Sequence, residues 1–146
     1  MRRSWAGPAI AFVVAAALAA CAALGGRALD ADLLHVTLLQ TNDHYVLEPV
    51  DGGRRGGMAR LATLVRDLKR ENPNTISALA GDTLSPSVES ALMRGRQMVA
   101  ALNAIGLDVA TFGNHEFDFG PEVLLERMRG SKFRWLSANV VGRRSG

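Results

Sequence analysis

Stretches with strand character alternate with helical patterns along the chain after residue 32, and this alternation limits the folds that the sequence can adopt. The strand patterns cover residues 33–41, 75–80, 107–112 and 133–137. The helical patterns between them cover residues 58–70, 87–105 and 122–129. An alternating order of this kind predicts a mostly parallel sheet with right-handed crossovers. We therefore expect an α/β fold with the element order β-α-β-α-β-α-β.

Local signals support the three helices. In the first, apolar residues recur at helical spacing, at Met58, Leu61, Leu64, Val65 and Leu68. Gly95 is a candidate break in the second helix, and Gly106 suits its C-terminal cap. Pro121 suits the first position of the third helix.

Three of the four expected strands are followed by a side chain that can bind a hard metal ion, namely Asp43, Asp82 and Asn114. The carboxyl ends of parallel strands meet at the ligand-binding edge of such a sheet. Carboxylate and amide oxygens suit Mn, Mg or Ca, and the adjacent imidazole of His115 extends the choice to Zn and Fe. Two such ions about 3.5–4 Å apart can bind both the attacking and the leaving oxygen of a phosphoryl transfer. The sequence thus predicts a metal site at this edge.

His115 and Asp118 lie three residues apart on the loop that follows the third expected strand. An imidazole held by a carboxylate can donate a proton or a hydrogen bond to a developing oxyanion. A zincin motif is excluded, because His115-Glu116 would need a second histidine at position 119, which is Phe119.

Residues 41–43 (Thr-Asn-Asp), 81–83 (Gly-Asp-Thr) and 113–118 (Gly-Asn-His-Glu-Phe-Asp) resemble the successive metal-site motifs of the calcineurin-like metallophosphoesterases. They are most similar to the 5'-nucleotidase branch, which includes UDP-sugar hydrolases, and residues 136–139 (Leu-Ser-Ala-Asn) match its next strand. The resemblance covers about residues 33–140. It implies half of a four-layer metallophosphoesterase sandwich.

The resemblance also implies roles for individual residues. Asp43 would ligate the first of two divalent ions (Zn, Mn, Mg, Ca or Fe), and Asp82 would bridge both. Asn114 would ligate the second ion and touch the phosphate of the substrate. His115, also in contact with the substrate, would form with Asp118 the pair that stabilises the transition state. The implied substrates are small phosphate esters, foremost nucleotides, and the implied process is nucleotide catabolism.

The sequence departs from the family pattern at the first metal motif. The family has a histidine ligand two positions after the first aspartate, whereas this chain has Tyr45 there and His44 between the two. Neighbouring side chains of an extended segment point to opposite sides, so Tyr45 is expected to face the site and His44 to face away. A phenol is a poorer ligand than an imidazole unless the metal deprotonates it.

The second departure is one of length. The family completes its site with later histidines and a C-terminal domain, and the 146 residues contain no histidine after His115. We therefore interpret residues 33–146 as the truncated N-terminal part of a metallophosphoesterase domain, and we expect this chain alone to be inactive.

Residues 1–20 have the pattern of an export signal, with Arg2-Arg3 before the charge-free apolar run 9–20. The small residues that precede Cys21 resemble the lipobox of bacterial lipoproteins, in which the cysteine is lipidated. This predicts a lipoprotein signal peptide, a tether over residues 21–32, and a periplasmic or cell-envelope protein anchored to the membrane through Cys21. The alternative is an ordinary secretory signal.

The amino-acid composition limits the kinds of binding partner that the chain is expected to have. The 17 basic and 14 acidic residues give a net charge of +3 without a polybasic run, so no nucleic-acid partner is expected. The single cysteine cannot form an internal disulfide, and no protein partner is evident. Two further hypotheses stay open: a non-catalytic envelope lipoprotein that binds a metal or phosphate, and an inactive truncated product.

Overall fold

The computed structural model describes residues 33–141, which from Val36 onward form one unit. The predicted signal peptide, the lipidation site Cys21 and the tether over residues 21–32 lie outside the described residues. Within residues 33–141, no helix is long and apolar enough to cross a membrane.

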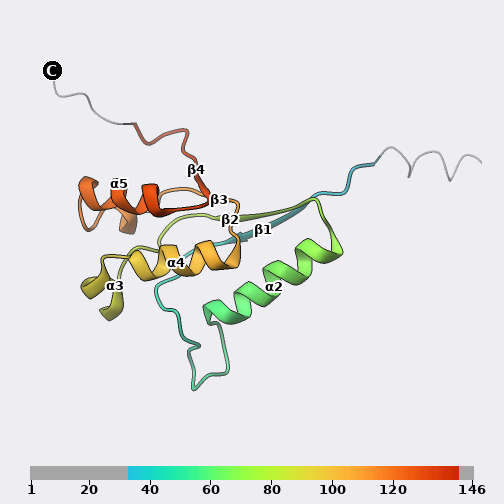
Figure 1. Ribbon diagram of the computed structural model, residues 1–146, viewed down its shortest axis with the longest axis horizontal. Helices are drawn as coiled ribbons and strands as arrows, with labels where there is room; N and C mark the ends of the chain where they lie inside the picture. Colours follow the sequence, from blue (N-terminus) through green and yellow to red (C-terminus); the bar gives the residue numbers. More distant parts are fainter. Residues whose placement is uncertain (1–32, 142–146) are drawn as a thin grey trace, which may run out of the picture. The chain divides into compact units, whose positions relative to one another are not determined.

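The sheet has four parallel strands in the order β1-β2-β3-β4 (Figure 1). The strands are β1 (Thr37–Thr41), β2 (Thr75–Leu79), β3 (Val109–Ala110) and β4 (Arg134–Trp135). Each pair of neighbours in the sheet is also consecutive along the chain, with helices in the connections. This confirms the α/β class and the parallel sheet predicted from the alternating pattern.

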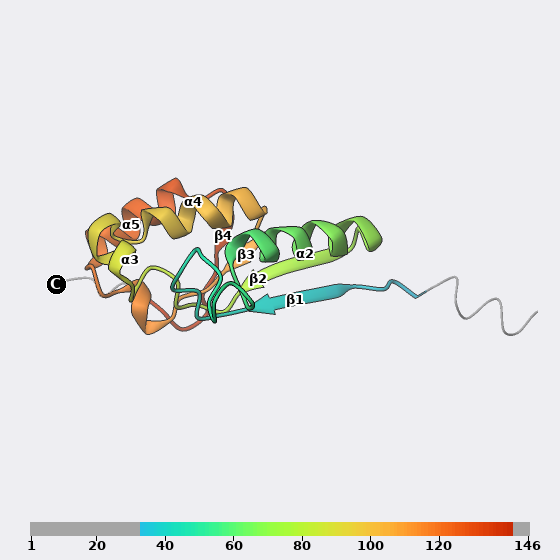
Figure 2. The same ribbon diagram turned by 90° about the horizontal axis from the view of Figure 1, so that it is seen from below.

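The helices are α2 (Met58–Glu71), α3 (Val88–Met93), α4 (Arg96–Ile105) and α5 (Pro121–Gly130), with a short 3-10 helix η1 (Asn114–Glu116). The helices α2 to α5 lie on the same side of the sheet, as Figure 2 shows. The main core forms between this helix layer and the sheet, where Leu79, Met98 and Leu102 are fully buried. Burial of such side chains contributes about 1.5–3 kcal/mol each before the entropic cost of ordering them is counted.

The helix expected over residues 87–105 is two helices. Arg94 and Gly95 both adopt left-handed backbone conformations, with φ of 49° and 74°, which end α3 and begin α4. A Cβ atom on Gly95 would lie 2.8 Å from the side chain of Leu84, so the close approach requires glycine here. Ser87 caps α3 by accepting the Ser90 N–H at 2.9 Å.

The strands are shorter than the apolar patterns indicated. Thr37 pairs with Thr75, the first residue of β2. In this register, residues 33–36 have no residue of β2 opposite them, so β1 begins at Thr37. The hydrogen bond from Leu107 N–H to the Leu102 carbonyl ends α4, so Leu107 belongs to the turn and not to β3. Hydrophobicity predicted the positions of the strands, and pairing decided their ends.

The sheet face opposite the helices is apolar and open. Leu38, Ile76 and Leu136 are 68%, 44% and 53% exposed. A shallow hollow of about 180 Å³ beside Leu136 is lined by residues of β2 and β3. In layered α/β folds, an apolar sheet face of this kind is usually covered by a further layer.

Candidate metal and catalytic site

The loops that follow β1, β2 and β3 meet at the carboxyl edge of the sheet. The Asp43 N–H donates to the Gly81 carbonyl at 3.2 Å, which joins the first loop to the second. The His115 N–H donates to Asp82 Oδ1 at 3.0 Å, which joins the second loop to the third. The aspartates and the histidine singled out in the sequence are therefore in one place. Asn114, the first residue of η1, is exposed directly before His115.

Both aspartates have a left-handed backbone conformation. The φ angles are 57° at Asp43 and 62° at Asp82, in a backbone region that residues other than glycine rarely adopt. Aspartate tolerates this region better than most residues, at some cost in backbone strain. The surrounding contacts hold both residues at the point where each strand turns into its loop, and strain of this kind is typical of functional sites.

Tyr45 faces the site, as its position in an extended segment predicted. Its hydroxyl donates to Asp43 Oδ1 at 2.5 Å, and its ring meets that of His115 edge-on with the centroids 5.8 Å apart. The hydrogen bonds from Tyr45 and Asn42 lower the pKa of Asp43. The same bond to Asp43 raises the pKa of Tyr45 to about 12. Tyr45 therefore acts in this structure as a protonated hydrogen-bond donor to Asp43.

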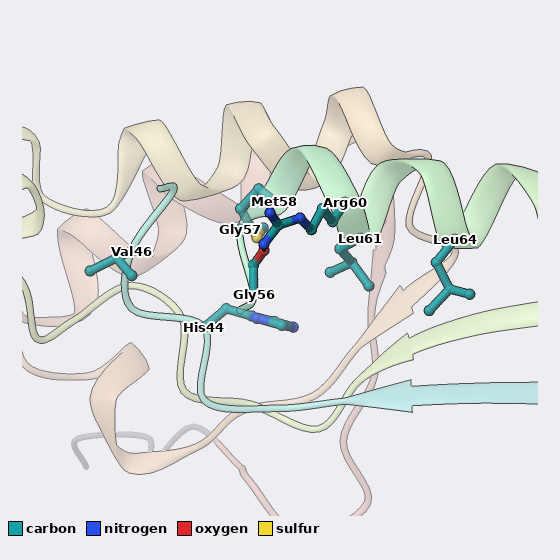
Figure 3. Close-up of a pocket in the computed structure, with 8 residues that line it drawn as sticks. All are labelled: His44, Val46, Gly56, Gly57, Met58, Arg60, Leu61 and Leu64. Carbon is teal, nitrogen blue, oxygen red and sulfur yellow. The ribbon is translucent and has the colours of Figure 1, made fainter. Parts of the chain in front are cut away.

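His44 lies on the other side of the segment and lines a separate pocket of about 280 Å³ against the start of α2 (Figure 3). Gly56, Gly57 and Leu61 also line this pocket. The Nε2 atom of His44 is buried and has no hydrogen-bond partner among the described residues, and burial lowers the pKa of the ring. His44 thus does not take the place that the family motif gives to its histidine.

His115 and Asp118 form a close pair, with Nδ1 and Oδ2 2.7 Å apart. The hydrogen bond to Asp118 raises the pKa of His115, and the same bond, with one from Ser85, lowers the pKa of Asp118. Ser85 is buried and donates its hydroxyl to the same Asp118 oxygen. Nothing in the local sequence indicates that Ser85 reaches Asp118, which lies 33 positions further along the chain.

Glu116 is a second residue of the site whose contacts the sequence does not predict. It is fully buried, and its carboxylate accepts backbone N–H groups of both the loop after β2 and the loop after β3. An acidic residue inside a loop motif is expected to be exposed, and only the fold shows otherwise.

The donor chemistry of the site suits a hard divalent cation, since Asp43 and Asp82 supply carboxylates and Asn114 an amide oxygen. Within residues 33–141, however, no group of three or more His, Cys, Asp and Glu side chains is arranged to hold a metal ion. The Asp43 carboxylate already accepts hydrogen bonds from Asn42 and Tyr45. The described residues therefore fit a metal by type and supply only part of a coordination sphere.

Comparison with known proteins identifies relatives of the chain, although no family model matches it. The probable 5'-nucleotidase of Treponema pallidum is 39% identical over 142 residues, which are 90% of this chain and 23% of that protein. The 5'-nucleotidase of Mus musculus is 35% identical over 93% of this chain and 26% of its own length. The chain thus spans about a quarter of the length of these relatives.

Solved structures agree. The NAD nucleotidase of Haemophilus influenzae superposes with a TM-score of 0.68 and 31% identity, over 75% of this chain and 21% of that one. The calcineurin-like phosphoesterase YfkN of Bacillus subtilis superposes with a TM-score of 0.54 and 26% identity, over 70% of this chain and 36% of that one. In sequence and in fold, the chain belongs to the 5'-nucleotidase branch of the calcineurin-like metallophosphoesterase superfamily.

Proposed function

We propose that this chain is the N-terminal part of an exported, metal-dependent phosphoesterase that hydrolyses nucleotides or related phosphate esters. The observation that carries the proposal is the convergence of Asp43, Asp82 and the His115–Asp118 pair on hydrogen-bonded loops at one sheet edge. Relatives that are named 5'-nucleotidases support the substrate class.

Asp43, Asp82 and Asn114 are the residues that would hold the divalent ions. When bound, such ions supply Lewis-acid stabilisation of a phosphoryl oxygen and lower the pKa of a coordinated water. We expect the remaining ligands to come from other parts of the complete protein.

His115 would act on the substrate through its second ring nitrogen. Its Nδ1 is held by Asp118, which orients the ring and leaves Nε2 for the phosphate or the leaving oxygen. The raised pKa of His115, caused first by the hydrogen bond to Asp118, favours the protonated ring. A protonated imidazole can stabilise negative charge on an equatorial oxygen or protonate the departing group. Ser85 would keep Asp118 in place.

The proposal places the protein in the periplasm or cell envelope. The proposed anchor is a lipid on Cys21, with residues 21–32 as the tether. The pattern that supports it is Arg2-Arg3 followed by the apolar run over residues 9–20. Metabolic labelling of the expressed protein with a fatty acid, compared with a Cys21→Ser variant, tests the anchor. Label that persists in the variant would contradict it.

The enzymatic proposal is tested with the complete gene product, expressed from a frame resequenced beyond codon 146. We expect this protein to release phosphate from AMP. A chelator should abolish the activity and added Mn²⁺ should restore it, and the Asp82→Ala variant should be inactive. Asp67→Ala, a change at a half-buried position of α2 outside the site, is the matched control. Turnover that is insensitive to both the chelator and Asp82→Ala would overturn the proposal. The 146-residue chain alone is expected to show little activity.

A further inference from the structure

Glu116 has the most extensive polar contacts of any side chain near the site, and none of the roles given above accounts for it. It is 0% exposed. Its Oε2 atom accepts the N–H of Asp82 at 2.8 Å and that of Gly113 at 2.6 Å. Its Oε1 atom accepts the N–H of Thr83 at 2.7 Å and that of Leu84 at 3.3 Å. One carboxylate therefore binds four backbone amides.

We propose that Glu116 is a positioning residue that fixes the loop carrying Asp82 against the loop carrying Asn114 and His115. This inference rests on the proposed function and goes beyond it, since Glu116 is neither a metal ligand nor in reach of a substrate. Its amide partners belong to both loops, residues 82–84 after β2 and Gly113 after β3.

The burial of the carboxylate explains why it can fix the loops. A carboxylate removed from water is strongly destabilising unless hydrogen bonds replace its hydration, and hydrogen bonds to a charged acceptor are about twice as strong as neutral ones. Successive N–H groups of a turn, such as those of residues 82–84, form a concavity that suits an anion. Any displacement of one loop from the other would leave part of this buried charge without donors.

The two loops share a second contact, and Glu116 sets its geometry. The His115 N–H donates to Asp82 Oδ1 at 3.0 Å, so the position of the Asp82 carboxylate depends on where both loops lie. Asp82 is a proposed metal ligand, and His115 would act on the substrate. A misplacement of about 1 Å in such a constellation can reduce the rate about a hundredfold. Glu116 thus acts through Asp82 and His115.

The test compares Glu116→Gln and Glu116→Ala in the complete gene product with Val65→Ala, a core change in α2 outside both loops. Glutamine keeps one acceptor oxygen and loses the other, so one pair of amides loses its partner. We expect Mn²⁺ affinity and kcat each to fall at least about tenfold in Glu116→Gln, while KM changes little. Both losses should be larger in Glu116→Ala. In Val65→Ala, unfolding by urea shifts while Mn²⁺ affinity and kcat stay near wild type.

Hydrogen exchange gives a readout that does not depend on activity. In Glu116→Gln the amides of Asp82 and Gly113, or those of Thr83 and Leu84, should lose protection selectively, whereas Val65→Ala should not change them in this way. If Glu116→Ala does not fold, Glu116→Gln carries the test.

The outcomes separate this inference from the proposed function. If Glu116→Gln keeps the Mn²⁺ affinity and the amide protection of wild type, the role of Glu116 is overturned, however much stability the variant loses. A wild-type protein that binds Mn²⁺ but hydrolyses no phosphate ester would instead contradict the proposed function, and the metal affinity and exchange of Glu116→Gln would still decide the role of Glu116.

Discussion

A Cβ atom on Gly113 would lie 2.0 Å from Oδ1 of Asp82, so the backbone of the loop after β3 rests directly against the carboxylate of the loop after β2. The converse contact is nearly as close, since a Cβ atom on Gly81 would lie 2.4 Å from the Gly113 nitrogen. No side chain fits at either position. The two glycines of the motifs are therefore required by the packing of the loops, in addition to the positive φ of 91° at Gly81.

The first prediction concerns Gly113→Ala. The new methyl group must displace the Asp82 carboxylate, and overpacking of this kind typically destabilises by about 1–3 kcal/mol. Because Asp82 is a proposed metal ligand, Mn²⁺ affinity measured by calorimetry should fall at least about tenfold, which corresponds to about 1.4 kcal/mol.

Gly130→Ala is the matched control for this prediction. Gly130 is the last residue of α5, and a Cβ atom there would meet nothing within 4 Å. Alanine is favoured over glycine in a helix by up to about 1 kcal/mol, so this variant should be as stable as wild type or more so, with unchanged Mn²⁺ affinity. Equal losses of affinity in the two variants would contradict the steric explanation.

The second prediction concerns the His115–Asp118 pair. Removal of a group that transfers or stabilises a proton commonly lowers the rate about 10²–10⁴-fold, and we expect His115→Ala to lower kcat in this range. Asp118→Asn keeps a hydrogen-bonding group near Nδ1 but removes the charge that favours the protonated ring, so its loss should be smaller. The measurement is the initial rate of AMP hydrolysis at saturating Mn²⁺.

His35→Ala supplies the control for the second prediction, because His35 is exposed and precedes β1. Its kcat should match that of wild type. Ser85→Ala should fall between wild type and Asp118→Asn, since it removes one of the two hydrogen bonds that hold the Asp118 carboxylate. An unchanged rate in His115→Ala would remove His115 from the mechanism.

The fold could be predicted from the sequence to the extent that it depends on local patterns. The period of the apolar residues located α2 within one residue of its observed end, because one face of that helix packs on the sheet. The ends of the strands could not be predicted in this way. β3 has only two residues, because its length depends on the neighbours with which it pairs and not on its own hydrophobicity.

The candidate site was likewise predictable only where it depends on local patterns. Strand-end positions suffice to bring Asp43, Asp82 and His115 together, because parallel strands share a carboxyl edge. The contacts of Glu116 and Ser85 join residues 30 or more positions apart, and they depend on how the loops fold over one another. Nothing in the local sequence distinguishes Glu116 from an exposed acidic residue. Three-dimensional contact is the information that the sequence pattern lacks.

The third prediction concerns pH and a pair outside the site. Burial raises the pKa of Asp108, but hydrogen bonds from Lys69 and from the Ser77 N–H and hydroxyl outweigh it and hold the pKa below its ordinary value of 3.8. The stabilisation from this lowered pKa is therefore present above about pH 4 and is lost as the pH falls through the folded-state pKa. Because both side chains are partly exposed, we expect it to be below about 1 kcal/mol.

Urea titrations between pH 7 and pH 3 check the third prediction. The free energy of unfolding of Asp108→Asn should lie below that of wild type at pH 7, and the gap should narrow in acid. Ser77→Ala removes only the hydroxyl donor, which lies 2.7 Å from Asp108 Oδ2, and should give a smaller gap. A gap that is the same at both pH values would mean that the charge of Asp108 contributes nothing.

The fourth prediction concerns Tyr45, the residue at the position where the family motif has a histidine ligand. Its hydroxyl donates to Asp43 Oδ1, and a pKa of about 12 keeps the phenol protonated near neutral pH. Tyr45→His replaces this donor with an imidazole on the same side of the segment, and imidazole suits Zn²⁺. We expect Zn²⁺ to bind at least about tenfold more tightly to Tyr45→His than to wild type.

Two companion variants separate the causes in the fourth prediction. Tyr45→Phe removes the hydroxyl and frees Asp43 Oδ1 without adding a ligand, so it measures how much of the gain comes from releasing Asp43 alone. His44→Ala changes the neighbouring residue, whose ring faces the pocket beside α2, and should leave Zn²⁺ affinity near that of wild type. If Tyr45→His and Tyr45→Phe bind Zn²⁺ equally well, the imidazole adds no ligand, and Tyr45 limits the site only by occupying Asp43.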